Sequence, residues 1–353
     1  MSKFKSEGPN GKEARIAFLD YLRIFAFLSV LIGHKFYADV AAAAENEKLH
    51  ATLRLLFRFL MPFVNGGGAG VIVFFLVSGY IISQVLRFEQ PKKFLIRRVF
   101  RIYPIYIVAV FIQIVIEKNW SAFSPAQLIP QLLLVGDFFN THYGLMGVEW
   151  TLRIEIVFYL FVALLKAAGF YDHRRHLLIS VLLVVTALIS QLPPFPNDPN
   201  LYQGYFLIFS PFLFMGIGFS LYEHNDINFY SLLGLVVAVF ANYFYLNSLY
   251  QPPTTLSAQF AALGFLIFSI AWFFRSKFQS TTGVTLLSNL TYPVYLFHNR
   301  MFDFFQIILP VIFFKIFVPR IVVIFLLPLV SHNRATGEQI RSHNFDHAFL
   351  MYA

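Results

Sequence analysis

Ionisable side chains that could take part in chemistry lie within stretches of the chain that are otherwise apolar. Asp20, Arg23 and His34 occupy the first such stretch, and Glu155 occupies a later one. A charged residue at the centre of a membrane-spanning helix costs roughly 2.5–3.5 kcal/mol on insertion scales, so its presence there indicates function by default. Histidine has the side chain whose unperturbed pKa lies nearest neutral pH, so His34 is a candidate general base.

The spacing of the first three residues predicts one polar stripe on a helix. His34 lies eleven positions after Arg23, a step that returns to nearly the same azimuth of an α-helix and spans about 16 Å. Asp20 precedes Arg23 by three residues, so the two can pair along that stripe. The alternative is structural: Asp20 and Arg23 form a buried ion pair, and His34 caps the outer end of the helix.

The segment WTLRIEIVFY supplies Trp150, Arg153 and Glu155. Glu155 lies about two turns into the predicted span, where its short side chain cannot reach water, whereas the longer Arg153 can snorkel outward. We therefore expect Glu155 to be functional. The alternative is that it serves as a structural partner for an arginine on a neighbouring helix.

Two further groups lie near predicted helix ends. Arg98 and Arg101 are three residues apart in RRVFRIYP, just before Pro104, which we expect to open a helix. Two guanidinium groups on one face suit phosphate recognition, although basic residues beside a span are also common topological anchors. His298 and Asn299 close the segment TYPVYLFHN, either as site residues or as simple interfacial caps.

The elements that must position these residues are membrane-spanning helices. Of 353 residues, 58% are hydrophobic and 13% are charged, and the mean hydropathy is +0.65, whereas soluble domains carry about 25% charged residues. We therefore predict an all-α, polytopic bundle with about ten spans. They are expected near 16–35, 67–86, 103–117, 148–166, 177–193, 203–221, 229–247, 257–274, 284–300 and 304–330.

Two shorter apolar segments, 50–63 and 124–136, are expected to be interfacial or re-entrant. Residues 1–330 then form a single transmembrane domain, and 331–353 an atypical polar C-terminal tail.

Basic residues indicate the orientation of this bundle. With the N-terminus inside, 17 Lys and Arg fall in the inner loops and tails and six in the outer ones. This asymmetry predicts that both termini are cytoplasmic, and it accounts for the net charge of +9 without nucleic acid as a partner. The chain has no cysteine, which excludes disulfides, thiolate-bound metals and a cysteine nucleophile. No metal site is expected.

Five passages together resemble the acyltransferase-3 family of integral membrane acyltransferases, and they keep that family's order along the chain. They are DYLRIFAFLSVLIGH at 20–34, VIVFFLVSGYIIS at 71–83, FLIRRVFRIYPIY at 94–106, WTLRIEIVFYLF at 150–161 and LSNLTYPVYLFHN at 287–299. The resemblance implies O-acetylation of a hydroxyl on a cell-surface carbohydrate or related glycoconjugate, as in polysaccharide modification. It also implies no tightly bound cofactor, an acyl-CoA donor such as acetyl-CoA on the cytoplasmic side, and a place in the bacterial inner (plasma) membrane.

The resemblance also assigns roles to residues. Arg23 and His34 match the family's first-helix arginine and histidine, of which the histidine is regarded as catalytic, and Asp20 is a candidate beside them. Arg98 and Arg101 match the Arg-x-x-Arg pair of the donor side. Further matches or candidates are Trp150, Glu155, Tyr292, His298 and Asn299.

The mechanism expected from these residues is direct acyl transfer assisted by a base. His34 would take the proton of the acceptor hydroxyl, Glu155 could orient or polarise an imidazole, and Arg98 and Arg101 would bind donor phosphates. The rival class is a multi-pass transporter or flippase that uses the buried charges as a relay. A non-catalytic scaffold is disfavoured, since buried charges cost stability.

Overall fold

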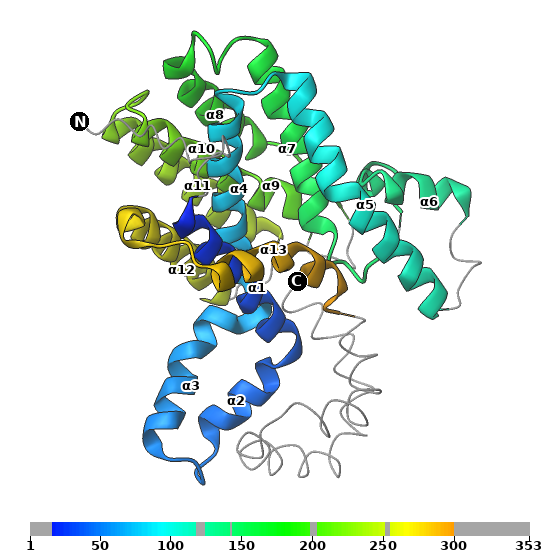
Figure 1. Ribbon diagram of the computed structural model, residues 1–353, viewed down its shortest axis with the longest axis vertical. Coiled ribbons are helices and arrows are strands. Elements are labelled where there is room, and N and C mark those ends of the chain that lie inside the picture. The colour runs from blue at the N-terminus through cyan, green and yellow to red at the C-terminus, as the bar shows by residue number, and fades with distance from the viewer. Residues whose placement is uncertain (1–15, 118–123, 142, 198–202, 251–254, 300–353) are drawn as a thin grey trace.

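The computed structural model describes residues 16–117, 124–141, 143–197, 203–250 and 255–299, and all regular structure in them is helical (Figure 1). The α-helices of this part are α1 Ala17–Lys35, α2 Tyr37–Glu45, α3 Ala51–Val64, α4 Gly68–Leu86, α5 Pro91–Glu117, α6 Pro125–Leu132, α7 Trp150–Ala167, α8 Arg175–Ile189, α9 Tyr205–Phe209, α10 Pro211–Glu223, α11 Phe229–Tyr250, α12 Thr255–Phe273 and α13 Thr282–Phe297. Short 3-10 helices lie between them: η1 Asn65–Gly67, η3 Gly136–Phe138 and η4 Arg275–Lys277.

Helix α4 is the packing centre of the bundle. Its contacts with α1, α10 and α12 are more extensive than its contacts with any other helix (Figure 1). Glycines make these contacts close. A Cβ at Gly79 of α4 would collide with the backbone of Leu213 on α10, and a Cβ at Gly216 of α10 would collide with the backbone of Leu76 on α4. Small residues that let helix backbones approach are the usual means of association in lipid, where apolar burial alone gives no driving force.

Around α4, the other helices pack against one another. Helix α5 packs on α7 and α13, and α8 packs on α11. Helices α2 and α3 form a hairpin that extends from the end of α1 (Figure 1). The chain returns from this hairpin to α4 through η1, where Gly66 and Gly67 have φ of 54° and 71°. Gly33 packs against this turn, so the last turn of α1 is held against the start of α4.

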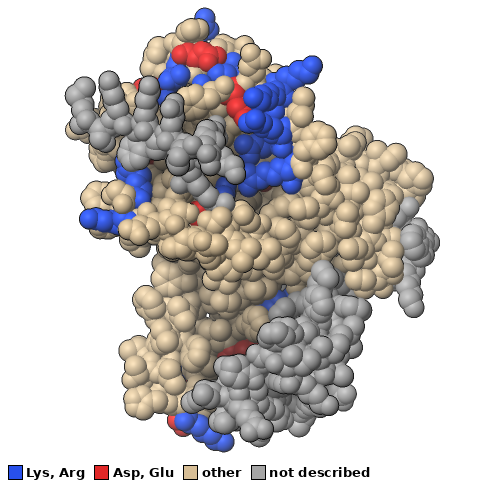
Figure 2. Space-filling model, viewed as in Figure 1, with Lys and Arg blue, Asp and Glu red and all other residues tan. Residues whose placement is uncertain are grey.

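Ion pairs join the helices at the end of the bundle that is expected to be cytoplasmic. Arg275 Nε lies 2.8 Å from Glu223 Oε1, and Tyr80 also donates to that carboxylate. Arg87 pairs with Asp226. Figure 2 shows other Lys and Arg side chains gathered over the start of α5; the exposed ones there include Lys92, Lys93 and Arg97.

The predicted all-α membrane architecture is confirmed in outline. Within the residues that the structure describes, five segments are long and apolar enough to cross a membrane: Ala17–Lys35, Ala51–Leu86, Pro91–Ile116, Tyr205–Glu223 and Phe229–Tyr250. Helices also cover the other expected spans, apart from 304–330, which lies outside the described residues with the tail 331–353. The number of spans and the orientation stay predictions.

One boundary was wrong. The span predicted at 103–117 is the second part of α5, which begins at Pro91 and runs through Pro104. The dense basic residues before Pro104 favour a loop in a hydropathy argument, but Phe94 and Ile102 are buried on one side of this helix, and their packing continues it. Arg98 and Arg101 therefore lie in the body of α5. The segments 50–63 and 124–136 contain α3 and α6.

Because α4 and α10 are in close contact, we expect alanine to change the stability of the protein very differently at two glycines. Gly79→Ala should destabilise the protein by about 1–3 kcal/mol, because the methyl group has no room against the α10 backbone. Gly234→Ala on α11 is the control: a Cβ there meets no atom within 4 Å, so the higher helix propensity of alanine should leave stability equal or greater. Thermal unfolding in detergent measures both. Equal loss in the two variants would contradict the packing argument.

Candidate active site

A cavity of about 90 Å³ lies between α1, α4, α5, α7 and α13. Roughly 10–15 Å³ suffices for one water molecule, so the cavity has room for a small chemical group and its solvent. Five residues singled out from the sequence line it, from four of these helices: Arg23, Arg98, Arg101, Glu155 and Tyr292. Most of the remaining wall is apolar, with Phe74 and Val77 among its residues.

Arg98 is the unusual cation of this cavity. It is 8% exposed, and in the described part of the chain neither it nor Arg101 forms an ion pair within 4 Å of a carboxylate oxygen. Its guanidinium carbon lies 5.2 Å from the ring centre of Phe94 and 5.9 Å from that of Tyr159, and its Nε atom has no hydrogen-bond partner. A buried guanidinium held by aromatic faces keeps its N–H groups available for an anion.

Glu155 faces the same arginines. It is 4% exposed, and it interacts electrostatically with Arg101 and Arg98 across the cavity. The hydroxyl of Ser78 on α4 donates to its Oε1 atom at 2.6 Å. Tyr159, one turn further along α7, is a second hydrogen-bond partner. Ser78 itself lines the cavity, and its hydroxyl holds this carboxylate.

Asp20 and Arg23 pair as their spacing predicts, with Arg23 Nη1 3.6 Å from Asp20 Oδ1. Asp20 is 1% exposed and also accepts a hydrogen bond from Ser288 of α13 at 2.7 Å. It therefore joins α1 to α13. Arg23 reaches the cavity, whereas Asp20 is not part of its wall.

A second imidazole, rather than Glu155, lies against His34. Nδ1 of His34 is 2.9 Å from Nε2 of His298, and the ring centres are 5.1 Å apart. His298 is buried and His34 is exposed. Val30 and Tyr295, each about one helical turn away in sequence, belong to the cavity wall. The histidine pair thus lies just beyond one end of the cavity.

The other sequence candidates have local roles. The Tyr292 hydroxyl donates to the backbone carbonyl of Ile102 on α5 at 2.8 Å. Trp150 packs edge-on against Tyr205, with ring centres 5.1 Å apart. Asn299 is 9% exposed and borders a separate cavity large enough for about one water molecule.

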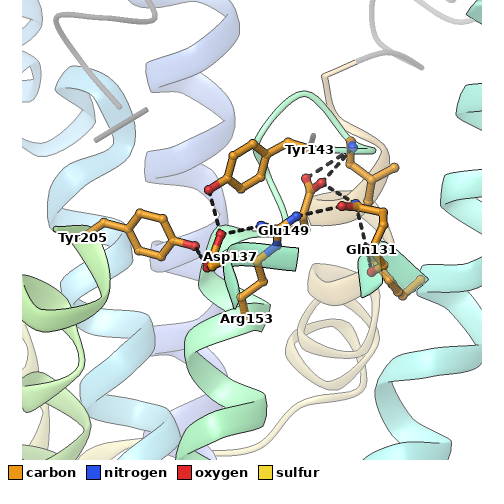
Figure 3. Close-up of polar contacts among 8 residues, drawn as sticks. Gln131, Asp137, Tyr143, Glu149, Arg153 and Tyr205 are labelled. Atoms are coloured by element: carbon orange, nitrogen blue, oxygen red, sulfur yellow. Dashed lines mark hydrogen bonds and ion pairs between the residues drawn. The ribbon is translucent and has the colours of Figure 1, made fainter. Parts of the chain in front are cut away.

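The sequence interpretation of Arg153 was wrong. This side chain does not snorkel outward: it is 2% exposed, it pairs with Asp137, and its Nη2 donates to Gln131 Oε1 at 2.7 Å (Figure 3). Its guanidinium carbon also lies 4.1 Å from the ring centre of Tyr143. These partners come from the segment between α5 and α7, so a sequence argument confined to one helix does not find them.

The rest of this network binds the start of α7 to its surroundings. Tyr205 and Tyr143 both donate to Asp137 (Figure 3). Glu149 is fully buried and accepts from Gln131 Nε2 at 2.7 Å and from the backbone N–H of Leu145 at 3.1 Å. Because Arg153 and Glu155 share one helix, this network also positions the cavity carboxylate.

Comparison with known proteins gives two matches of different weight. A family model described as an acyltransferase domain matches residues 16–331. The O-acetyl transferase of Shigella phage Sf6 is 25% identical over 189 residues, which is 49% of this chain and 52% of that protein. The chain is thus aligned with about half of that relative's length. No solved structure matches the chain.

The network around Arg153 predicts a large stability effect. Arg153→Leu should lower the free energy of unfolding by about 3–5 kcal/mol, because it leaves Asp137 buried without its cation. The control is Arg58→Leu, whose ion pair with Glu45 is exposed and should contribute at most about 1 kcal/mol. Thermal unfolding in detergent compares them. A small effect at Arg153 would show that this network does not stabilise α7.

Proposed function

Because this chain belongs to the acyltransferase-3 family, we propose that it transfers an acetyl group from a cytoplasmic acyl-CoA-type donor to a hydroxyl of a cell-surface carbohydrate or related acceptor. Family membership makes the protein a membrane acyltransferase, and the matched relative is an O-acetyl transferase. A transporter or flippase is not supported. The bacterial inner membrane is the proposed location, since the donor is cytoplasmic and the acceptor is outside.

One observation carries the proposal: a single cavity has the arginine pair and Glu155 in its wall and ends about one helical turn from the two histidines. The arginines and the histidine pair lie on different helices, far apart in sequence. An enzyme that joins a donor from one side of the bilayer to an acceptor from the other needs such a connection between two polar sites.

Donor phosphates would bind Arg98 and Arg101, which in the described part of the chain form no ion pair within 4 Å of a carboxylate oxygen. Guanidinium groups bind phosphate oxygens through charge-assisted, often bidentate hydrogen bonds. Glu155 would then keep the two guanidinium groups apart and oriented, since it interacts with both. This role replaces the one expected from the sequence, in which Glu155 orients an imidazole. The apolar wall beyond the arginines suits the thioester arm.

The chemical step is assigned to His34. Its imidazole would take the proton of the acceptor hydroxyl while the hydroxyl oxygen attacks the thioester carbonyl carbon. The carbon–sulfur bond then breaks, and the imidazolium returns the proton to the departing thiolate. His34 is the exposed member of the histidine pair, so it is the member open to an acceptor.

Donor binding is tested at the arginines. Changing both Arg98 and Arg101 to Gln should weaken binding of acetyl-CoA to the purified protein by about 10- to 100-fold, because two charge-assisted contacts are lost. Changing Lys92 and Lys93 to Gln is the control: it removes the same charge from the exposed start of α5 and should have a much smaller effect. Titration calorimetry measures both. Equal weakening by the two pairs would indicate general electrostatic attraction instead of a site.

Catalysis is tested at His34. His34→Ala should lower transfer of labelled acetyl groups in vesicles by about 10²–10⁴-fold while acetyl-CoA still binds, because a base is lost and the arginines remain. His176→Ala, at an exposed histidine outside the site, should transfer label at the wild-type rate. Equal transfer by the His34 variant and the wild type would remove His34 as the base. Absence of transfer by the wild type with any acceptor extract would contradict the proposed function.

A further inference from the structure

The two histidines differ in what their ring nitrogens face. Nδ1 of His298 lies 2.5 Å from the backbone carbonyl oxygen of Tyr295, and Nε2 of His298 lies 2.9 Å from Nδ1 of His34. A carbonyl oxygen only accepts hydrogen bonds. Nδ1 of His298 must therefore carry a proton.

The proton on Nδ1 of His298 determines which nitrogen of neutral His34 carries its proton. A neutral imidazole has one N–H and one unprotonated nitrogen. In neutral His298 the proton is on Nδ1, so Nε2 is an acceptor and Nδ1 of His34 must donate to it. The unprotonated nitrogen of His34 is then Nε2. The alternative tautomer of His34 would place two lone pairs against each other at 2.9 Å.

Helix α13 holds His298 firmly in this arrangement. The carbonyl of Tyr295 belongs to the last turn of α13, where helix carbonyls lack intrahelical donors. The Tyr295 side chain is fixed in turn, because its hydroxyl lies 2.9 Å from Thr151 Oγ1 and 3.0 Å from the carbonyl oxygen of Val148. The carbonyl that orients His298 therefore lies on a residue anchored to α7.

We propose that His298 is a positioning residue that fixes His34 in the tautomer whose Nε2 atom is the base. The inference rests on the proposed function and assigns the reacting nitrogen within it. When Nε2 takes the acceptor proton, both nitrogens of His34 become donors, and Nδ1–H already has its acceptor in His298.

Three substitutions separate this role from a structural one. His298→Gln places an amide oxygen near the position of Nε2 and can still accept from His34. His298→Asn can donate to the Tyr295 carbonyl, but it is too short to reach His34. His298→Leu does neither. The matched control is His224, whose Nδ1 lies 2.8 Å from the carbonyl oxygen of Ser220 near the end of α10; it has the same ring-to-carbonyl contact outside the site.

The expected order of kcat among the variants depends on whether a hydrogen-bond acceptor remains at the position of His298 Nε2. In the labelled acetyl-transfer assay, kcat should fall about 100-fold or more in the Asn and Leu variants, as loss of tautomer control commonly costs on this scale. The Gln variant should keep at least about a tenth of the wild-type kcat. KM for acetyl-CoA should change less than about twofold in all three, and His224→Gln and His224→Leu should match the wild type.

Each other outcome overturns the inference. If Asn rescues kcat and Gln does not, His298 only holds the last turn of α13. If Gln and Leu lose equally, with the wild type active and thermal unfolding unchanged, the tautomer argument is wrong and the proposed function stands. If the wild type transfers no label, both fail together.

Discussion

A charged side chain inside a bundle of membrane helices has to find its partner within the protein, because lipid supplies none. Much of the polar interior follows from this constraint. Arg153 is matched by Asp137, Asp20 by Arg23 and Ser288, and Glu155 by Ser78. Arg98 differs, since in the described residues it forms no ion pair within 4 Å and its guanidinium lies against aromatic rings. In the proposed function, the phosphates of the donor meet this requirement at Arg98.

The sequence predicted the membranous, all-helical class and the helix positions because both depend on local hydropathy. It also named Arg23, Arg98, Arg101, Glu155 and Tyr292, which the fold brings to one cavity. Periodicity could only say that each residue faces the interior of the bundle. Which interior residues meet depends on how α1, α5, α7 and α13 are arranged around α4. Close backbone contacts contribute to that arrangement, such as the contact of Gly70 on α4 with the backbone of Ala26 on α1.

The misjudged residues share one physical origin. Arg153 was considered on its own helix. Its partners are Gln131, in the segment 124–136 that was expected to be interfacial or re-entrant, and Asp137, directly after it. His34 and His298 are 264 residues apart, so no local pattern connects them. The start of α5 was placed too late because a row of basic residues resembles a loop, although Phe94 and Ile102 pack into the core there. Each error comes from a long-range contact that outweighs a local signal.

The continuity of α5 through Pro104 has a mechanical consequence. Proline has no N–H to bond the carbonyl four residues earlier, so the helix is weakest at that point. The part from Pro91 to Pro104 is held instead by its side chains, since Phe94 and Ile102 are buried. The places of Arg98 and Arg101 in the cavity wall therefore depend on this packing and not on an unbroken ladder of helix hydrogen bonds.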